Sequence, residues 1–145
     1  MARAWILLCL ALGLHVCDEA TTGFLGVYNP TVVALRERFG WWPMPTFGFG
    51  EWLAGLIIAC VVLLALTGAV SRGAKGTRLI AYIFATIMLL NACSHTVATI
   101  FGQTVDSVTF PRPAPGFWSS PIMAAAAIYL LIELRRSSPK IVEAA

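Results

Sequence analysis

Charged residues are scarce in this sequence, and their scarcity indicates the class of protein. Only 12% of the 145 residues are charged, whereas 59% are hydrophobic and the mean hydropathy is +0.81. An ordinary water-soluble domain carries about twice that share of charged residues. The composition therefore argues against a soluble domain and predicts a protein whose natural solvent is the lipid bilayer.

Histidine and cysteine are also rare. The chain has two histidines and four cysteines, and no two cysteines form a Cys-x-x-Cys pair. This spacing does not match a thiolate zinc site. Two of the cysteines lie inside apolar runs, where a thiol usually acts as a small hydrophobic side chain. Cys17 and Cys93 lie near the polar residues described below, where each is a ligand, half of a disulfide, or neither.

Four apolar segments are long enough to cross, or nearly cross, a bilayer. They cover approximately residues 4–20, 51–70, 79–101 and 117–134. A hydrocarbon core about 30 Å thick requires about 20 helical residues. The first segment also resembles the apolar core of a signal peptide, but no small-x-small cleavage site follows it, which favours a retained helix. We predict an all-α membrane protein, in which residues 1–145 form a single transmembrane domain folded as a four-transmembrane-helix bundle.

The segment 21–50, between the first two spans, has a different character. It is rich in glycine, proline and aromatic residues, too polar to span a membrane and too apolar for a free linker. Asn29 and Pro30 resemble a helix N-cap and a first-turn proline, and Gly40 resembles a C-terminal stop. This pattern predicts a short interfacial helix over about 30–39, with tryptophans placed where interfacial aromatics usually lie.

Basic residues cluster on one side of the predicted topology. Seven fall on the side of the two termini and of the loop between spans two and three: Arg3, Arg72, Lys75, Arg78, Arg135, Arg136 and Lys140. Three fall on the other side: Arg36, Arg38 and Arg112. The positive-inside rule therefore predicts a multi-pass protein with both termini in the cytoplasm. The net charge of +3 comes from these few residues and predicts no nucleic-acid partner.

Polar residues in the first and third spans fall at one height in the predicted bundle. Both spans run outward from a basic residue and rise about 1.5 Å per residue, which places His15 level with Asn91 and Glu19 level with His95. His15 and Glu19 are four residues apart, as are Asn91 and His95, so each pair lies on one helix face. Asp18 borders the first of these faces. These positions lie in the outer half of the predicted membrane spans. The sequence leaves open whether the two faces point toward each other, and a shared site requires that they do.

Burying ionisable groups at such depth in the membrane costs free energy, and these groups usually face a bundle interior or a wet cavity. A functional site is therefore the expected interpretation. We predict that His15, Glu19, Asn91, His95 and Asp18 form a catalytic site. His15, Glu19 and His95 offer two imidazoles and a carboxylate to a divalent metal such as zinc or iron. The same groups also suit metal-free acid/base chemistry, with the carboxyl as proton donor and a histidine as relay.

These residues also carry a resemblance to known families. The runs HVCDE at 15–19 and NACSH at 91–95, with the Pro-Gly pair at 115–116, resemble the HXXEE family of bacterial integral membrane proteins. Asp18 stands where the family has the first of two glutamates, which keeps the charge but shortens its reach. The resemblance implies a four-helix protein of the bacterial inner membrane and supplies no activity. A weaker similarity, to the emopamil-binding sterol isomerases, rests on a histidine and a glutamate four residues apart and implies acid/base chemistry.

Two classes of function fit the sequence, which leaves open whether the protein is an enzyme. The first is an enzyme acting on a lipid-like substrate, with membrane lipid and a hydrophobic small molecule as its partners. The second is a non-enzymatic ligand-binding protein, transporter subunit or helix-partner module whose polar band is an interhelical lock. The sequence slightly favours the first, because spans two and four are nearly bare of polar residues where a transport pathway would continue.

Structural roles are the competing interpretation for each polar residue. In this interpretation the acids of the first span face outer water and pair with Arg36 or Arg38. The histidines and the asparagine then serve only as hydrogen-bonding groups between helices. Glu51, at the start of the second span, either closes the polar band from a third helix or caps its own helix, and capping is the simpler interpretation.

Overall fold

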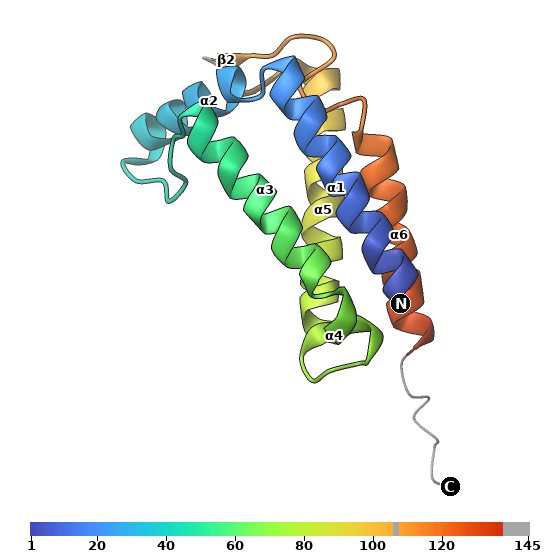
Figure 1. The fold of residues 1–145 in the computed structure, drawn as a ribbon. Helices are drawn as coiled ribbons and strands as arrows, with labels where there is room; N and C mark the ends of the chain where they lie inside the picture. Colours follow the sequence, from blue (N-terminus) through green and yellow to red (C-terminus); the bar gives the residue numbers. More distant parts are fainter. Residues whose placement is uncertain (106–107, 138–145) are drawn as a thin grey trace, which may run out of the picture.

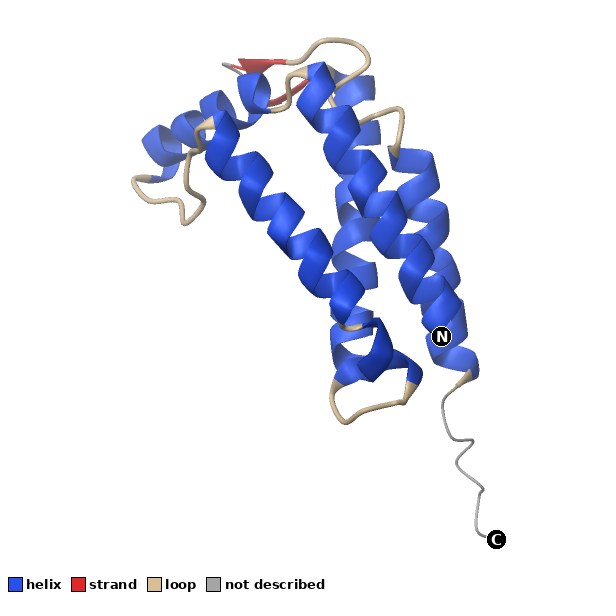
Figure 2. Cartoon of the chain, in the orientation of Figure 1, coloured by secondary structure: helices blue, strands red, loops and turns tan. Residues whose placement is uncertain are grey.

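The computed structural model describes residues 1–105 and 108–137 and is almost entirely helical (Figure 1, Figure 2). Its helices are α1 (Ala2–Thr22), α2 (Leu25–Phe39), α3 (Phe49–Ala65), α4 (Thr67–Ser71), α5 (Thr77–Phe101) and α6 (Ser120–Arg136). Two very short strands, β1 (Gln103–Val105) and β2 (Val108–Thr109), pair antiparallel beyond the end of α5. The predicted all-α class is confirmed, while Lys140 of the charge pattern lies outside the described residues.

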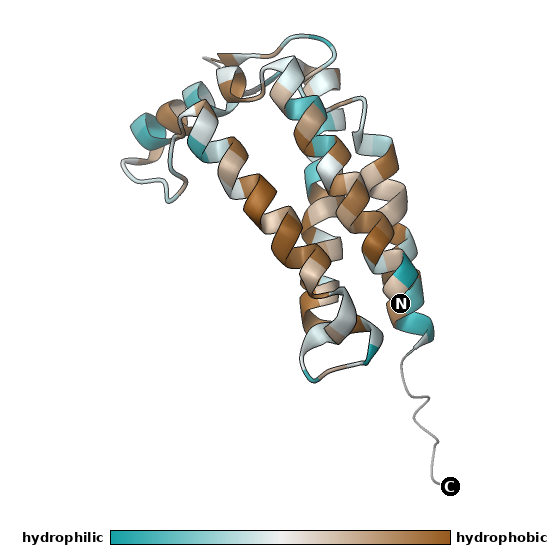
Figure 3. Cartoon of the chain, in the orientation of Figure 1, coloured by the Kyte–Doolittle hydropathy of each residue, from teal (hydrophilic) through white to brown (hydrophobic). Residues whose placement is uncertain are grey.

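Three helical stretches of the described chain are long and apolar enough to cross a membrane. These are α1, the combined stretch Phe49–Ser71 of α3 and α4, and α5. Figure 3 shows the apolar residues along these helices, most densely on α3. The fourth predicted span corresponds to α6, whose 17 residues extend about 25 Å and fall just short of the others. Three candidate spans are therefore observed, and the fourth stays a prediction.

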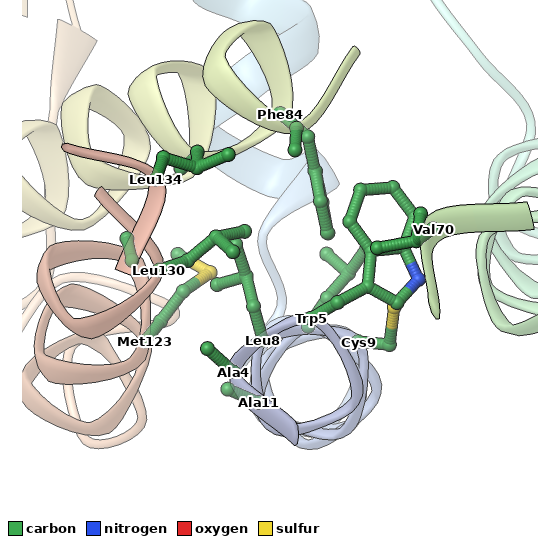
Figure 4. Packing of buried hydrophobic residues seen from close by; sticks show 14 of the residues in the cluster. Ala4, Trp5, Leu8, Cys9, Ala11, Val70, Phe84, Met123, Leu130 and Leu134 are labelled. Carbon is green, nitrogen blue, oxygen red and sulfur yellow. The ribbon is translucent and has the colours of Figure 1, made fainter. Parts of the chain in front are cut away.

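The hydrophobic core lies where α1 packs against α5, α6 and α4 (Figure 4). Leu8 of α1 and Leu130 and Met123 of α6 are fully buried together. Trp5 reaches across from α1, with its ring 5.2 Å from the ring of Phe84 and its indole nitrogen donating a hydrogen bond to a backbone carbonyl of α3 at 2.9 Å. Alanines at the helix contacts let the backbones approach closely, as is usual in membrane bundles. This core fixes the position of α1, which carries half of the candidate site.

The helix α3 presents most of its surface outward. Only 6% of its most apolar window is buried, compared with 50% for α1. Its side chains Ile57, Ile58, Val61 and Val62 are each more than half exposed. A continuous apolar surface of this kind is rare on a soluble monomer, because water does not solvate it well. The exposed surface agrees with the composition in pointing to a lipid environment.

The helix α2 differs from the predicted interfacial helix at its start. It begins at Leu25, five residues before Pro30, and ends at Gly40, whose φ of 68° is the left-handed conformation expected of a glycine stop. The predicted N-cap at Asn29 is wrong, because the Asn29 amide instead bonds the backbone of Phe47 twice, at 2.9 and 3.1 Å. These bonds tie the loop before α3 back onto α2.

Candidate metal centre

Three side chains from α1 and α5 converge where the C-terminal ends of these helices meet. His15 Nε2 lies 3.2 Å from His95 Nε2, and Glu19 Oε1 lies 3.4 Å from the first nitrogen and 3.1 Å from the second. All three side chains are buried, with exposed fractions of 1%, 5% and 6% for His15, Glu19 and His95. The two polar faces, whose mutual orientation the sequence leaves open, therefore point toward each other. The three residues form a group able to hold a metal ion.

The spacing of these atoms suits a divalent ion. Zinc binds histidine nitrogen and carboxylate oxygen at about 2.0–2.1 Å, so two ligands of a tetrahedral ion lie about 3.3 Å apart. The three edges observed here, 3.1, 3.2 and 3.4 Å, all fall near that separation. Two imidazoles and one carboxylate also form the ligand set of many non-haem iron sites. The donor set therefore fits zinc or iron and leaves at least one coordination position open.

A serine and an aspartate orient the ring of His15. His15 Nδ1 lies 2.7 Å from Ser119 Oγ, and that hydroxyl donates to Asp18 Oδ2 at 2.8 Å. Because the Ser119 hydroxyl donates its hydrogen to the carboxylate, it accepts a hydrogen bond from the N–H at Nδ1 of His15. The other ring nitrogen, Nε2, then carries a lone pair that faces Glu19 and His95. Such outer partners commonly fix the tautomer of a metal-binding histidine. Asp18 belongs to the site as predicted, but it acts on His15 through Ser119.

A glycine backbone lies against both imidazole rings. Gly116 has a φ of +80°, and a Cβ added there would fall 2.8 Å from His95 Cε1 and 2.9 Å from His15 Cε1. A side chain at this position would therefore displace both rings. Ser120 Oγ donates to the Gly116 carbonyl at 2.7 Å, which anchors the turn to the start of α6. The Pro-Gly pair noted in the sequence thus places bare backbone over the centre.

Asn91 joins the centre from one turn before His95. Its side-chain nitrogen lies 3.2 Å from His15 Nε2 and donates to the lone pair that Ser119 leaves free, a hydrogen bond that a metal ion on this nitrogen would replace. This amide is partly buried, in contrast to the three enclosed ligand residues. All five residues predicted for the site are therefore gathered in one network, three as potential ligands and two as their neighbours.

Sequence reasoning missed two parts of this network, Ser119 and Phe24. The sequence does contain a signal for Ser119, because this residue lies at the start of the predicted fourth span and so at the same height as the end of the first. Phe24 follows α1 directly, and its ring centre lies 5.9 Å from that of His95 and 5.8 Å from that of Trp52. Its neighbourhood depends on the bend after α1, which no local pattern specifies.

Two other candidate interactions lie away from the centre. The Glu51 carboxylate accepts a hydrogen bond from the backbone nitrogen of Gly48 at 3.1 Å, so its capping role is confirmed. The proposed pairing of the first-span acids with Arg36 is wrong, because that guanidinium donates to the Met44 carbonyl at 2.6 Å. Those acids turn inward because Ser119 and the histidines offer buried partners that compensate for the loss of water.

The cysteines near the polar band do not join the centre. Cys17 and Cys93 are both exposed and free of disulfide bonds. The potential metal ligands of the described chain at this position are therefore nitrogen and oxygen atoms. Ligands of this type suit zinc and iron better than soft thiophilic ions.

A largely apolar pocket of about 290 Å³ opens beside the centre. Val27 and Tyr28 of α2 line it, together with Phe24 just before that helix, Phe110, and the polar residues Asn91 and His95 of α5. Burial raises the pKa of the Tyr28 phenol, an effect partly offset by Arg36, so the hydroxyl stays neutral. The candidate centre is thus connected to a space large enough for a small apolar ligand.

Comparisons of this chain with protein-family models, with curated proteins and with solved structures found no match. The resemblance to the HXXEE family and the similarity to the emopamil-binding isomerases therefore stay predictions. The function proposed below rests on the geometry of the centre.

Proposed function

We propose that this chain is a membrane enzyme that binds one zinc or iron ion through His15, Glu19 and His95. The observation that carries the proposal is the buried triangle of three ligand atoms with edges of 3.1–3.4 Å. Structural metal sites are usually closed by four protein ligands, whereas catalytic sites keep a position for water or substrate. Three ligands beside a pocket match the catalytic type.

We propose four membrane spans, with α6 as the fourth. Its 17 residues fall at the lower end of the spanning range, and its Ile122, Ile128 and Ile132 side chains point outward. The start of α1 lies near the end of α6 in Figure 1, and the terminal ammonium is 3.5 Å from Glu133 Oε2. This proximity supports a topology with both ends on one side, which the basic residues assign to the cytoplasm. The centre then lies in the outer half of the membrane.

Each residue of the centre has a defined role in this proposal. A divalent ion here would polarise a substrate oxygen or lower the pKa of a bound water. Glu19 supplies negative charge that offsets part of the charge of the ion, while Ser119 and Asp18 hold the lone pair of His15 toward it. Asn91 reaches both the centre and the pocket, so its amide is placed to donate to a substrate oxygen. Hydrolysis and oxidation are the reaction classes that this arrangement supports.

A non-enzymatic polar lock is the second candidate function. It is favoured by one observation, that the Nε2–H of His95 lies within hydrogen-bond distance of both Glu19 Oε1, at 3.1 Å, and the lone pair of His15 Nε2, at 3.2 Å. Hydrogen bonds of this kind between membrane helices contribute roughly 0.6–2 kcal/mol. In that case the network would join α1, α5 and the start of α6 without metal or chemistry.

Metal analysis of a matched pair of glutamine variants separates the two candidates. Glu19→Gln removes the carboxylate ligand, whereas Glu51→Gln makes the same chemical change at a helix cap remote from the centre. We expect about one metal ion per chain in detergent-purified wild type and in Glu51→Gln, and much less in Glu19→Gln. A wild type that stays metal-free after growth and dialysis with zinc or iron would refute the metal centre and leave the polar lock.

A further inference from the structure

The pocket beside His95 has apolar walls and one polar end. Phe24, Val27 and Phe110 line it with apolar side chains. The hydroxyls of Thr31 and Ser94, which also line it, each donate to a backbone carbonyl of their own helix at 2.7 Å. The Tyr28 hydroxyl is occupied with the Pro45 carbonyl at 3.0 Å, outside the lining residues. An incoming polar group is therefore best met at the end formed by Asn91 and His95. This distribution of polarity matches a ligand with one polar end and a hydrocarbon remainder.

The size of the pocket limits how much hydrocarbon it holds. Its volume of about 290 Å³ is about twice that of an engineered cavity of roughly 150 Å³ that binds benzene. By that ratio it encloses about twelve carbon atoms. One acyl or isoprenoid chain fits this space, whereas the two chains of a phospholipid do not fit side by side.

The polar end favours an oxygen-bearing headgroup. Asn91 Nδ2 is a hydrogen-bond donor, and it stands 3.2 Å from His15 Nε2, next to the proposed metal ligands. Hydroxyl, ester and carboxyl oxygens accept such a bond and also bind zinc or iron. An ammonium headgroup would bring positive charge to the proposed ion and would be repelled. The ligand is thereby restricted to neutral or acidic amphiphiles.

We infer that this pocket binds a single-chain amphiphile, with about twelve carbons against α2 and its oxygen-bearing headgroup at Asn91 and His95. The position of the headgroup rests on the function proposed above, whereas occupancy of the apolar part does not depend on the metal. In the proposed topology the pocket lies toward the outer face, beside the interfacial helix α2. An amphiphile of the outer leaflet has its headgroup at a comparable depth.

Photolabelling with a twelve-carbon alcohol that carries a chain diazirine tests this inference. The protein is labelled in nanodiscs, and the modified peptides are located by mass spectrometry. Val27→Trp fills the pocket from α2, whereas Val33→Trp places the same bulk on the same helix at a site 44% exposed and outside this pocket. We expect labelling of peptides containing residues 24–31 or Phe110 in wild type and in Val33→Trp, and at least a fivefold loss in Val27→Trp.

Competition and metal analysis separate this inference from the proposed function. Excess dodecanol is expected to suppress labelling, and dodecane, which lacks an oxygen, much less. Equal labelling of Val27→Trp and Val33→Trp would overturn the inference. Suppression of labelling by dodecane as strong as that by dodecanol would overturn the assignment of the headgroup to Asn91 and His95. Loss of labelling in Val27→Trp with full metal content supports it. A wild type that binds no metal would refute the metal centre. Pocket labelling that dodecanol suppresses in that same protein would still support amphiphile binding.

Discussion

Gly116 is the residue whose substitution tests the geometry of the centre most sensitively without altering a ligand. Its backbone has φ +80°, and an added Cβ would meet His95 Cε1 at 2.8 Å and His15 Cε1 at 2.9 Å. Real Cβ atoms do not approach carbon this closely, so Gly116→Ala must move both rings or the turn that covers them. We expect the variant to lose stability and metal together.

The expected magnitude follows from two separate costs. A non-glycine residue in the left-handed region costs about 1–2 kcal/mol. Overpacking a filled site costs about a further 1–3 kcal/mol. Gly23→Ala isolates the first cost, because Gly23 has a φ of +79° but nothing within 4 Å of its added Cβ. The free energy of unfolding should therefore fall by about 2–5 kcal/mol in Gly116→Ala and by about 1–2 kcal/mol in Gly23→Ala.

Detergent titration of the two variants, followed by tryptophan fluorescence, measures these free energies, and metal analysis of the same samples gives occupancy. We expect Gly23→Ala to retain the metal of the wild type, while Gly116→Ala loses most of it because its ligands are displaced. Equal stability and equal metal content in the two variants would refute the close packing of Gly116 on the imidazoles.

Three further predictions concern the support of the centre and the core. Ser119→Ala removes the partner of His15 Nδ1 and should weaken metal affinity by roughly 10–100-fold in a chelator competition, whereas Ser94→Ala, on an exposed serine, should not. Leu130→Ala should lower the free energy of unfolding by about 2–4 kcal/mol, and Leu79→Ala, 64% exposed, by far less. Asn29→Ala should speed proteolysis of the loop before α3, because that loop loses both of its bonds to the asparagine.

The sequence predicts the height and the helix face of the polar residues on α1 and α5 because helix geometry is regular. A rise of about 1.5 Å per residue and a spacing of four fix the height and the face of each polar pair once the starts of the spans are known. His15, Glu19, Asn91 and His95 are therefore predicted to share one height, with Asp18 beside them. That α1 and α5 face each other depends on the packing of the whole bundle, which local spacing does not specify.

The parts that escaped prediction belong to loops and bends. Ser119 reaches the centre from the segment before α6, and Phe24 from the bend after α1, and the positions of both depend on tertiary packing. The start of α2 was also misplaced, since Asn29 has two satisfactory uses, as a cap or as a partner of Phe47, and local sequence does not choose between them.

X-ray absorption at the metal edge, on purified protein loaded with zinc, tests the central claim most directly. We expect two imidazole ligands and oxygen donors at about 2.0–2.1 Å in wild type, and one imidazole fewer in His95→Ala. A spectrum with no histidine scattering, or one unchanged by His95→Ala, would contradict the assignment of His15, Glu19 and His95 as a metal centre.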